Sequence, residues 1–245
     1  MSEFKKEYLG AGITCFVSDD HTFGTDAVLL AHFAAPKSKT VCCDLGSGCG
    51  IIPLLWCKGE TGHITAVEIQ EQAARQIDEA IEFNSLEDRL TSICADLRNL
   101  KGFVPFGHFD LVTMNPPYKA SGAGIISKSD ADKIARHDTM CTLNDMCECA
   151  AHLLNFGGRF CACIRPERLS ELFVTMSKNG IEPKRLRLVS KYPGKAPWLA
   201  LIEGKRGAKS SLKVENELYV YGPGGEYSDE MKMIYGDYLL ENRSD

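Results

Sequence analysis

A ten-residue stretch, 41–50 (VCCDLGSGCG), places the strongest constraint on the fold of this chain. Its first half suits a buried strand that carries an acid, Asp44, and glycine then occupies every second position. The apolar run 51–57 that follows suits the first turns of a buried helix. Glycine has no Cβ, so its backbone N–H groups can approach a ligand closely and its φ can be positive at little cost. A strand, a glycine loop and a helix in this order are typical of a nucleotide-binding site in an α/β protein.

Three further β-rich runs each end on polar residues. Run 64–68 ends on Glu68, about twenty residues after the loop, where a carboxylate can accept hydrogen bonds from both hydroxyls of a ribose. Run 90–96 ends on Asp96, and run 109–114 leads into Asn115-Pro116-Pro117-Tyr118. Strands alternating with helical patterns predict a doubly wound, mostly parallel α/β sheet of seven strands with an antiparallel edge strand.

The rest of the chain fits around this sheet. We expect a helix that starts at 24–26 and runs into 27–31, further helices at 142–154, 169–178 and 227–240, and strands at 159–164, 185–190 and 198–203, the last two forming an antiparallel pair at the sheet edge. Thr25 is expected to cap the first of these helices. The glycine-rich segment 119–124 is interpreted as a flap beside the site.

Length and composition fit a single domain. A chain of 245 residues, 44% of them hydrophobic, suits one α/β domain spanning 1–245, with an N-terminal extension at 1–38 and a C-terminal extension at 214–245. It has no run of 18 apolar residues, and residues 1–6 are too polar for a signal peptide. We therefore expect a cytoplasmic protein with no membrane association, and no obligate protein partner is inferred.

Eleven cysteines occur in the chain, many of them inside apparent strands. In a cytoplasmic protein, such residues are expected to be buried, reduced thiols. Two Cys-x-Cys pairs, 147/149 and 161/163, lack the spacing of two to four residues that zinc ligands usually have. No metal is predicted.

The tetrapeptide Asn115-Pro116-Pro117-Tyr118 resembles the signature of enzymes that methylate a planar, amide-like or amino nitrogen, and we interpret its four residues as catalytic. The lone pair of an exocyclic amino group is delocalised into the ring, so this nitrogen is a poor nucleophile. The Asn115 side-chain oxygen and a backbone carbonyl of the Pro-Pro segment can each accept one N–H, which draws the nitrogen toward tetrahedral geometry and stabilises its growing positive charge. The prolines hold these carbonyls with fixed φ, and Tyr118 offers a face for stacking on a base.

The glycine loop, Glu68, Asp96 and the tetrapeptide together resemble a class I S-adenosylmethionine-dependent methyltransferase. Pieces outside the site, at 23–30, 134–137, 201–205 and 218–221, resemble the bacterial tRNA(Val) adenine N6-methyltransferase group, and the likeness runs from about residue 23 to 240. This resemblance implies S-adenosylmethionine as cofactor and methylation of the adenine 3′ to the anticodon of a valine tRNA. The cofactor-binding residues it implies are Thr25, Asp44, Gly46, Ser47, Gly48, Glu68, Ile69, Asp96, Leu97 and Asn115.

Charge indicates where an RNA would bind. The segment from Lys178 to Lys213 contains ten lysines and arginines and only two glutamates. Its net charge is therefore +8, in a chain whose total net charge is −5. Such clustering on an acidic protein is typical of a phosphate-binding surface. The predicted RNA contacts are Lys184, Arg185, Arg187, Lys191 and Lys195.

Other functions would use part of the same pattern. A protein-glutamine N5-methyltransferase for release factors needs the same tetrapeptide, because an amide nitrogen poses the same chemical problem. Such an enzyme usually carries an amino-terminal helical domain, and only about forty residues precede the glycine loop here. A non-catalytic RNA-binding factor has no use for Asp44, Glu68 and Asn115 together. A nicotinamide enzyme has no use for the tetrapeptide.

Overall fold

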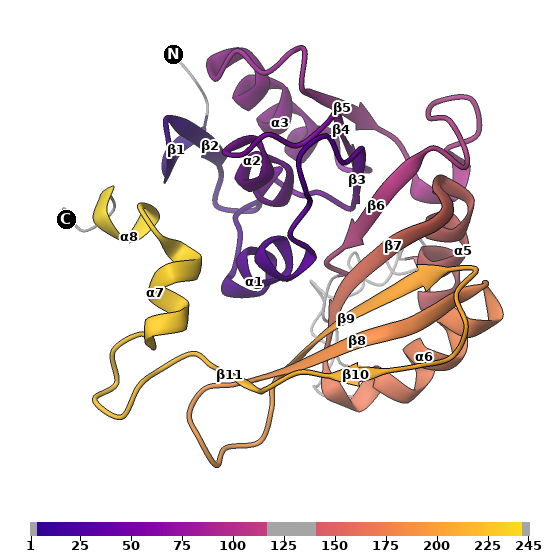
Figure 1. Cartoon of the computed structure of the whole chain (residues 1–245). Coiled ribbons are helices and arrows are strands. Elements are labelled where there is room, and N and C mark those ends of the chain that lie inside the picture. The colour runs from indigo at the N-terminus through magenta and orange to yellow at the C-terminus, as the bar shows by residue number, and fades with distance from the viewer. Residues whose placement is uncertain (1–3, 117–140, 242–245) are drawn as a thin grey trace, which may run out of the picture.

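The computed structural model describes residues 4–116 and 141–241, with the backbone alone for 240 and 241 (Figure 1). Within these ranges the main sheet has nine strands. In spatial order from one edge, the seven longer strands are β5 (Leu90–Cys94), β4 (Ile64–Glu68), β3 (Cys42–Leu45), β6 (Phe109–Met114), β7 (Leu154–Ile164), β9 (Leu199–Arg206) and β8 (Ile181–Ser190). Two short strands, β10 (Lys213–Val214) and β11 (Leu218–Tyr219), both pair with β8 at the other edge. The predicted doubly wound α/β fold is confirmed.

Strand direction sets where the site can lie. Strands β5, β4, β3, β6 and β7 are all parallel. β9 is antiparallel to both β7 and β8, so β8 points in the same direction as β7. The predicted antiparallel pair at this side of the sheet is therefore present as β8 and β9. Because β9 also pairs with β7, the antiparallel strand β9 is an interior strand of the sheet. β8 lies beyond β9, on its far side from β7.

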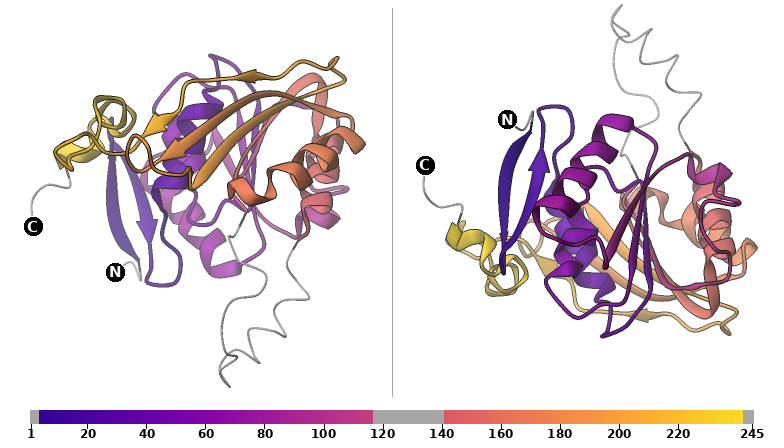
Figure 2. Two further views of the ribbon diagram at one scale, coloured as in Figure 1. Left: turned by 90° about the horizontal axis from the view of Figure 1, so that it is seen from below. Right: turned by 90° about the horizontal axis from the view of Figure 1, so that it is seen from above.

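Helices cover both faces of the sheet (Figure 2). One face carries α1 (Thr25–Ala34), α2 (Ile51–Cys57) and α3 (Glu71–Phe83), and the other carries α5 (Leu143–Leu153) and α6 (Leu169–Lys178). Successive strand residues point to opposite faces: Cys42 belongs to the first hydrophobic cluster and Cys43 to the second. This burial on both faces explains why the strands read as nearly continuous apolar runs.

Helix boundaries follow the sequence signals at some ends and depart from them at others. Thr142 caps α5 in a capping box with Asp145, as a Thr-x-x-Asp pattern should. At α1 the prediction is wrong: the cap residue is Gly24, and no side chain caps the helix. The expected helix at 227–240 is also wrong in part, because Gly236 adopts φ +51° and separates α7 (Asp229–Tyr235) from α8 (Tyr238–Glu241).

A hairpin near the N-terminus was not predicted. Strands β1 (Lys5–Gly10) and β2 (Ile13–Val17) form a separate two-stranded antiparallel sheet. Figure 1 shows this hairpin beside α8, and the two elements are in contact. Phe16 from the hairpin and Met231 from α7 belong to the same hydrophobic cluster as α1 and α2, so both chain extensions share that core.

The cysteines are all reduced, and ten of the eleven are buried or half-buried, as expected. Over residues 4–116 and 141–241, no group of three or more histidine, cysteine, aspartate or glutamate side chains is arranged to hold a metal ion. No helix within these ranges is long and apolar enough to cross a membrane.

Candidate cofactor and active site

The carboxyl ends of the five parallel strands bring the predicted site residues to one edge of the sheet. This edge runs across the ends of the strands and is not one of the lateral edges formed by the outermost strands. The loop after β3 carries the glycines, β4 ends on Glu68, Asp96 follows β5, and Asn115 follows β6. The loop after β3 bonds to the neighbouring strand β4 at this edge: the Ser47 N–H donates to the Val67 carbonyl, with a donor–acceptor distance of 3.0 Å. Open α/β sheets bind ligands outside the carboxyl ends of their strands, and this edge is where the candidate site lies.

The glycine loop turns with positive φ at each of its glycines. At Gly48, φ is +55°, and an added Cβ would meet no protein atom within 4 Å. Glycine at this position is therefore required by the backbone, while the space beside it stays open to a ligand. At Gly50 the reason is packing as well, since a Cβ would lie 3.0 Å from the Ile77 side chain on α3.

Glu68 connects the glycine loop to the neighbouring strand. One carboxylate oxygen accepts a hydrogen bond from the Gly48 N–H at 2.8 Å, and the other accepts from the Gln70 N–H at 2.9 Å. The residue is only 4% exposed. A carboxylate oxygen can accept more than one hydrogen bond, so this side chain can hold the loop and still accept from the hydroxyls of a ribose. The contact with Gly48 was not predicted, and the role of Glu68 toward a ribose stays a prediction.

Asp44 is fully buried at the end of β3. Its Oδ1 accepts a 2.6 Å hydrogen bond from the Thr113 hydroxyl on β6, whereas its Oδ2 has no partner among the described residues. Burial raises the pKa of Asp44 to about 7, because a charged carboxylate is poorly solvated there. A buried acceptor without a donor is costly, so this oxygen suits a cationic or N–H-bearing ligand group.

The raised pKa of Asp44 predicts how stability depends on pH. The folded protein keeps this proton up to about pH 7, while the unfolded chain releases it near 3.8. The contribution of Asp44 to the free energy of unfolding therefore falls as pH rises through this window, by at most about 1.4 kcal/mol per pH unit. Denaturant unfolding of the wild type and of Asp44→Asn at several pH values measures it. Stability curves that run parallel from pH 4 to 7 would contradict the prediction.

Asn115 has a neighbour that the sequence did not reveal. The Cys163 thiol, buried on β7, donates a hydrogen bond to the Asn115 side-chain oxygen at 3.0 Å. β6 and β7 pair in parallel, so residues 48 positions apart in the chain meet here. Sequence reasoning noted the Cys161/Cys163 pair and asked only whether it bound metal. Its placement near the end of a strand that pairs with β6 was the signal that could have indicated this contact.

Asp96 and Leu97 begin the loop after β5. The Asp96 carboxylate accepts hydrogen bonds from the Arg98 guanidinium and from the Arg98 N–H, which lowers the pKa of this carboxyl. The short helix η1 (Leu97–Asn99) starts there. A role for Arg98 was not predicted from the sequence. Its guanidinium pairs with the Asp96 carboxylate, which is the group expected to face the adenine ring of the cofactor.

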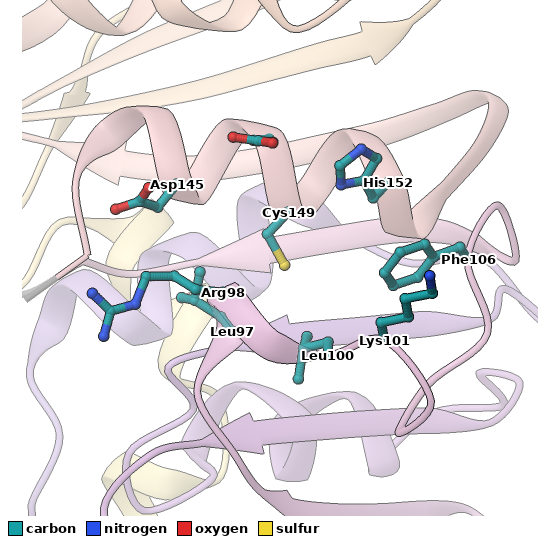
Figure 3. A pocket seen from close by; sticks show the side chains of 9 residues that line it. Leu97, Arg98, Leu100, Lys101, Phe106, Asp145, Cys149 and His152 are labelled. Carbon is teal, nitrogen blue, oxygen red and sulfur yellow. The ribbon is translucent and has the colours of Figure 1, made fainter. Parts of the chain in front are cut away.

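A pocket of about 340 Å³ lies between η1 and α5 (Figure 3). Side chains of both charge signs line the pocket: the basic Arg98 and Lys101 on the η1 side, and the acidic Asp145 on the α5 side. Leu97 is the only predicted site residue among those that line it. Neither the glycine loop nor Asn115 contributes, so this pocket is distinct from the edge where the other site residues meet.

Two other predicted cofactor residues have different surroundings. Ile69 follows Glu68 directly and is 50% exposed, which leaves an apolar side chain at the site edge available to a ligand. The Thr25 hydroxyl is hydrogen-bonded to the Tyr235 hydroxyl on α7 at 2.9 Å. Thr25 therefore connects α1 to the C-terminal extension.

The predicted RNA contacts differ in how free their charges are. The Arg185 guanidinium pairs with Glu203 at 3.0 Å and lies 3.9 Å from the centre of the Phe33 ring. Arg187 donates two hydrogen bonds to Glu230, and its side chain is only 16% exposed. Lys184 donates to the Lys209 carbonyl and to the Ser211 hydroxyl. Lys191 and Lys195, in the connection from β8 to β9, are both exposed.

Several sequence expectations lie outside the described residues. These are Pro117 and Tyr118 of the tetrapeptide, the flap at 119–124 and the family-like piece at 134–137.

Comparison with solved structures identifies the fold. A predicted O-methyltransferase from Agrobacterium tumefaciens superposes with a TM-score of 0.71 at 19% identity, covering 87% of this chain and 97% of that one. A 16S rRNA N2 G1207 methyltransferase from T. thermophilus, solved with AdoMet and guanosine, gives a TM-score of 0.56 at 17% identity and covers 84% and 51%. At these identities the likeness concerns the fold alone.

Sequence comparison reaches further. A tRNA1(Val) (adenine(37)-N6)-methyltransferase from Tolumonas auensis is 27% identical over 219 residues, covering 89% of each chain. A protein of the same name from Pectobacterium carotovorum is 28% identical over 221 residues and covers 89% of this chain and 86% of the relative. Residues 13–165 match the family model described as "Methyltransferase small domain". Because that match spans more than half of the sequence and includes the whole strand edge just described, the chain belongs to the methyltransferase small domain family.

Proposed function

We propose that this protein methylates N6 of an adenine in RNA, specifically the adenine 3′ to the anticodon of a valine tRNA. The observation that carries this proposal is the similarity over 89% of the chain to enzymes named for that reaction. Asn115 follows β6 at the edge that also carries the glycine loop and Glu68, and the Asn-Pro-Pro-Tyr sequence that it begins suits the chemistry of an amino nitrogen. We place the reaction in the cytoplasm, where such a tRNA is found.

S-adenosylmethionine, the proposed cofactor, supplies an electrophilic methyl group on a sulfonium centre. Glu68 would accept hydrogen bonds from the ribose hydroxyls, and the loop from Gly46 to Gly48 would enclose the methionine portion. The unpartnered Oδ2 of Asp44 suits the ammonium group of that portion. Ile69 and Leu97 offer apolar contacts for the adenine ring, and Asp96 together with Thr25 completes the proposed set.

Asn115 is the proposed catalytic residue. Its side-chain oxygen would accept one N–H of the target amino group while a carbonyl of the Pro116-Pro117 segment accepts the other, and Tyr118 would stack on the base. The two acceptors favour the amino nitrogen in its tetrahedral form and stabilise the positive charge that grows during attack. The proton leaves afterwards to solvent, so no strongly basic side chain is needed.

Methylation of tRNA from a strain that lacks this protein tests the function. The purified enzyme and isotopically labelled donor are incubated with total tRNA, and the nucleosides are separated by mass spectrometry. We expect label in N6-methyladenosine, and an adenine-to-guanine change 3′ to the anticodon of a valine tRNA transcript should abolish it. Label found in a release-factor glutamine and absent from RNA would instead support the protein-glutamine alternative.

The contact from Cys163 makes a separate prediction. The Cys163 thiol, 3.0 Å from the Asn115 oxygen, should hold the carboxamide in the orientation that its role requires. Cys163→Ala removes this donor and should lower kcat by roughly 3- to 10-fold, the value of one net hydrogen bond, with little change in KM for either substrate. Cys163→Ser keeps a donor and should restore most of the rate.

Cys161→Ala is the matched control for that series. Cys161 lies two residues earlier on β7 with the same complete burial, but it contacts Glu203 and not Asn115. If both alanine variants lower kcat equally, the effect comes from core packing, and the positioning role of Cys163 is wrong.

A further inference from the structure

We propose that the connection from β8 to β9 is a platform on which the unpaired RNA strand next to the target adenine stacks. The platform consists of Lys191, Tyr192, Lys195 and Trp198, with Arg165 beside them. This inference rests on the proposed function and assigns a place on the surface to its RNA substrate.

Strand direction places the platform at the catalytic edge. β8 runs parallel to β7, and β7 runs parallel to β6. The carboxyl end of β8, at Ser190, is therefore at the same edge of the sheet as Asn115. The 191–198 connection begins there, between β8 and β9 (Figure 1). Arg165 follows Ile164, the last residue of β7.

The same argument divides the basic segment at 178–213. Lys184 lies near the amino end of β8, and Lys205 lies near the carboxyl end of the antiparallel β9, so both are toward the opposite edge of the sheet. Arg185 and Arg187 are paired with carboxylates. Of the five predicted RNA contacts, Lys191 and Lys195 are the two that are exposed at the end of the sheet where Asn115 lies.

Aromatic faces accompany these charges. Tyr192 is 37% exposed. The Arg165 guanidinium lies 5.5 Å from the centre of the Trp198 ring and donates a hydrogen bond to the Trp198 carbonyl at 3.0 Å. No acidic residue occurs between 190 and 198. An exposed aromatic ring on which a base stacks, together with cations that follow the phosphates, is how proteins bind single-stranded nucleic acid. Tyr192 is the exposed ring here, and the half-buried Trp198 holds Arg165 beside it.

Hydrogen bonds and aromatic contacts within the protein hold the platform in place. The buried Ser190 hydroxyl lies 2.9 Å from the Lys195 carbonyl oxygen and also contacts the Glu217 carboxylate, and the Lys195 N–H donates to the Tyr192 carbonyl at 3.2 Å, which closes the connection into a turn. The centre of the Tyr192 ring lies 5.3 Å from the centre of the Tyr221 ring. Tyr221 is the first of a series of stacked tyrosines. That series continues through Tyr227, Tyr235 and Tyr238.

This arrangement selects for an unpaired strand. Bases inside an A-form helix are stacked on one another and offer no free face to a tyrosine, whereas bases of a loop can be splayed out onto one. A loop adenine is also the only kind that an enzyme can reach without first opening a duplex. The expected occupant is therefore the loop strand that flanks the target base.

Binding of an unmodified valine tRNA transcript, measured at several salt concentrations, tests the platform. Lys191→Ala with Lys195→Ala should lower the slope of log affinity against log salt by about 1.4 units, because each phosphate contact on a single strand contributes about 0.7. Lys205→Ala with Lys209→Ala removes the same charge from two exposed lysines at and just after the carboxyl end of β9, at the opposite edge, and is the matched control. Its slope should equal that of the wild type.

Tyr192 gives an independent measurement at constant charge. Tyr192→Ala should weaken binding of the tRNA roughly 5- to 150-fold, the range for loss of one base–aromatic stack, and should leave the salt slope unchanged. Tyr192→Phe keeps the ring and should bind like the wild type. For each variant, donor affinity by calorimetry and the thermal unfolding midpoint confirm that the fold is intact.

The outcomes separate the platform from the proposed function. If the wild type methylates the tRNA but the platform variants bind it as tightly as the control variant does, the platform is wrong and the function stands. If the wild type shows no salt-dependent affinity for RNA and transfers no label to it, the function itself is wrong. Equal losses in the platform and control variants would indicate a diffuse charge effect and would also contradict the platform.

Discussion

Replacing Asn115 by alanine is expected to lower turnover by about a hundredfold or more while donor affinity stays nearly unchanged. The side-chain oxygen is proposed to act on the target amino group in the transition state, and removal of one such preorganised partner typically costs 10²- to 10³-fold in kcat. The donor would be held by the glycine loop and Glu68, which this substitution does not touch. The measurement is kcat with saturating donor and tRNA, together with donor affinity by calorimetry.

The substitution also removes the acceptor of the Cys163 thiol, so its effect on stability must be separated from its effect on catalysis. Thermal unfolding of Asn115→Ala provides that check. Asn144→Ala, at an exposed position on α5, is the control for loss of a carboxamide that is not among the proposed site residues. Near-normal turnover in a folded Asn115→Ala variant would remove Asn115 from the catalytic step.

Replacing Glu68 by alanine should weaken donor binding by about 1.5–3 kcal/mol, the value of a hydrogen bond to a charged group. This corresponds to an increase in Kd of roughly 10- to 150-fold. The structure adds a second reason: the carboxylate also accepts from the Gly48 and Gln70 N–H groups, so its loss leaves two backbone donors without their partner. We expect lower stability as well as weaker binding.

Glu68→Gln distinguishes the two contributions. The amide keeps the size of the side chain and one acceptor oxygen, but it has no charge and cannot accept on both sides. It should therefore recover more stability than donor affinity. Glu71→Ala, an exposed acid in the first turn of α3, controls for the change in charge. Equal donor affinity in Glu68→Ala and the wild type would exclude Glu68 from the cofactor site.

The sequence by itself determined the fold and the order of the motifs along it. Buried parallel strands require apolar runs, and a tight turn from β3 into α2 requires glycines with positive φ, so both leave local patterns that can be read directly. The capping box at Thr142 is equally local, because its two partners are three residues apart. Once parallel strands are inferred, the meeting of Glu68 with the glycine loop follows from geometry.

Only the tertiary structure decided which charges and polar groups are already paired. Arg187 looks like a free cation in the sequence, yet its partner Glu230 is 43 residues away in α7. The Cys163–Asn115 contact joins residues 48 apart, through a strand pairing that no local pattern specifies. The N-terminal hairpin was missed, and the C-terminal helix was expected to continue through Gly236.

The location of the proposed RNA platform is of the same kind. Its cations stand out in the sequence only as part of a longer basic segment, and the direction of β8 assigns Lys191 to the catalytic edge and Lys184 to the other. Charge composition is a sum over residues and carries no direction, whereas a strand carries its two ends to opposite edges of the sheet. For this reason the sequence could indicate a basic segment, and only the folded chain could show at which edge of the sheet each of its charges lies.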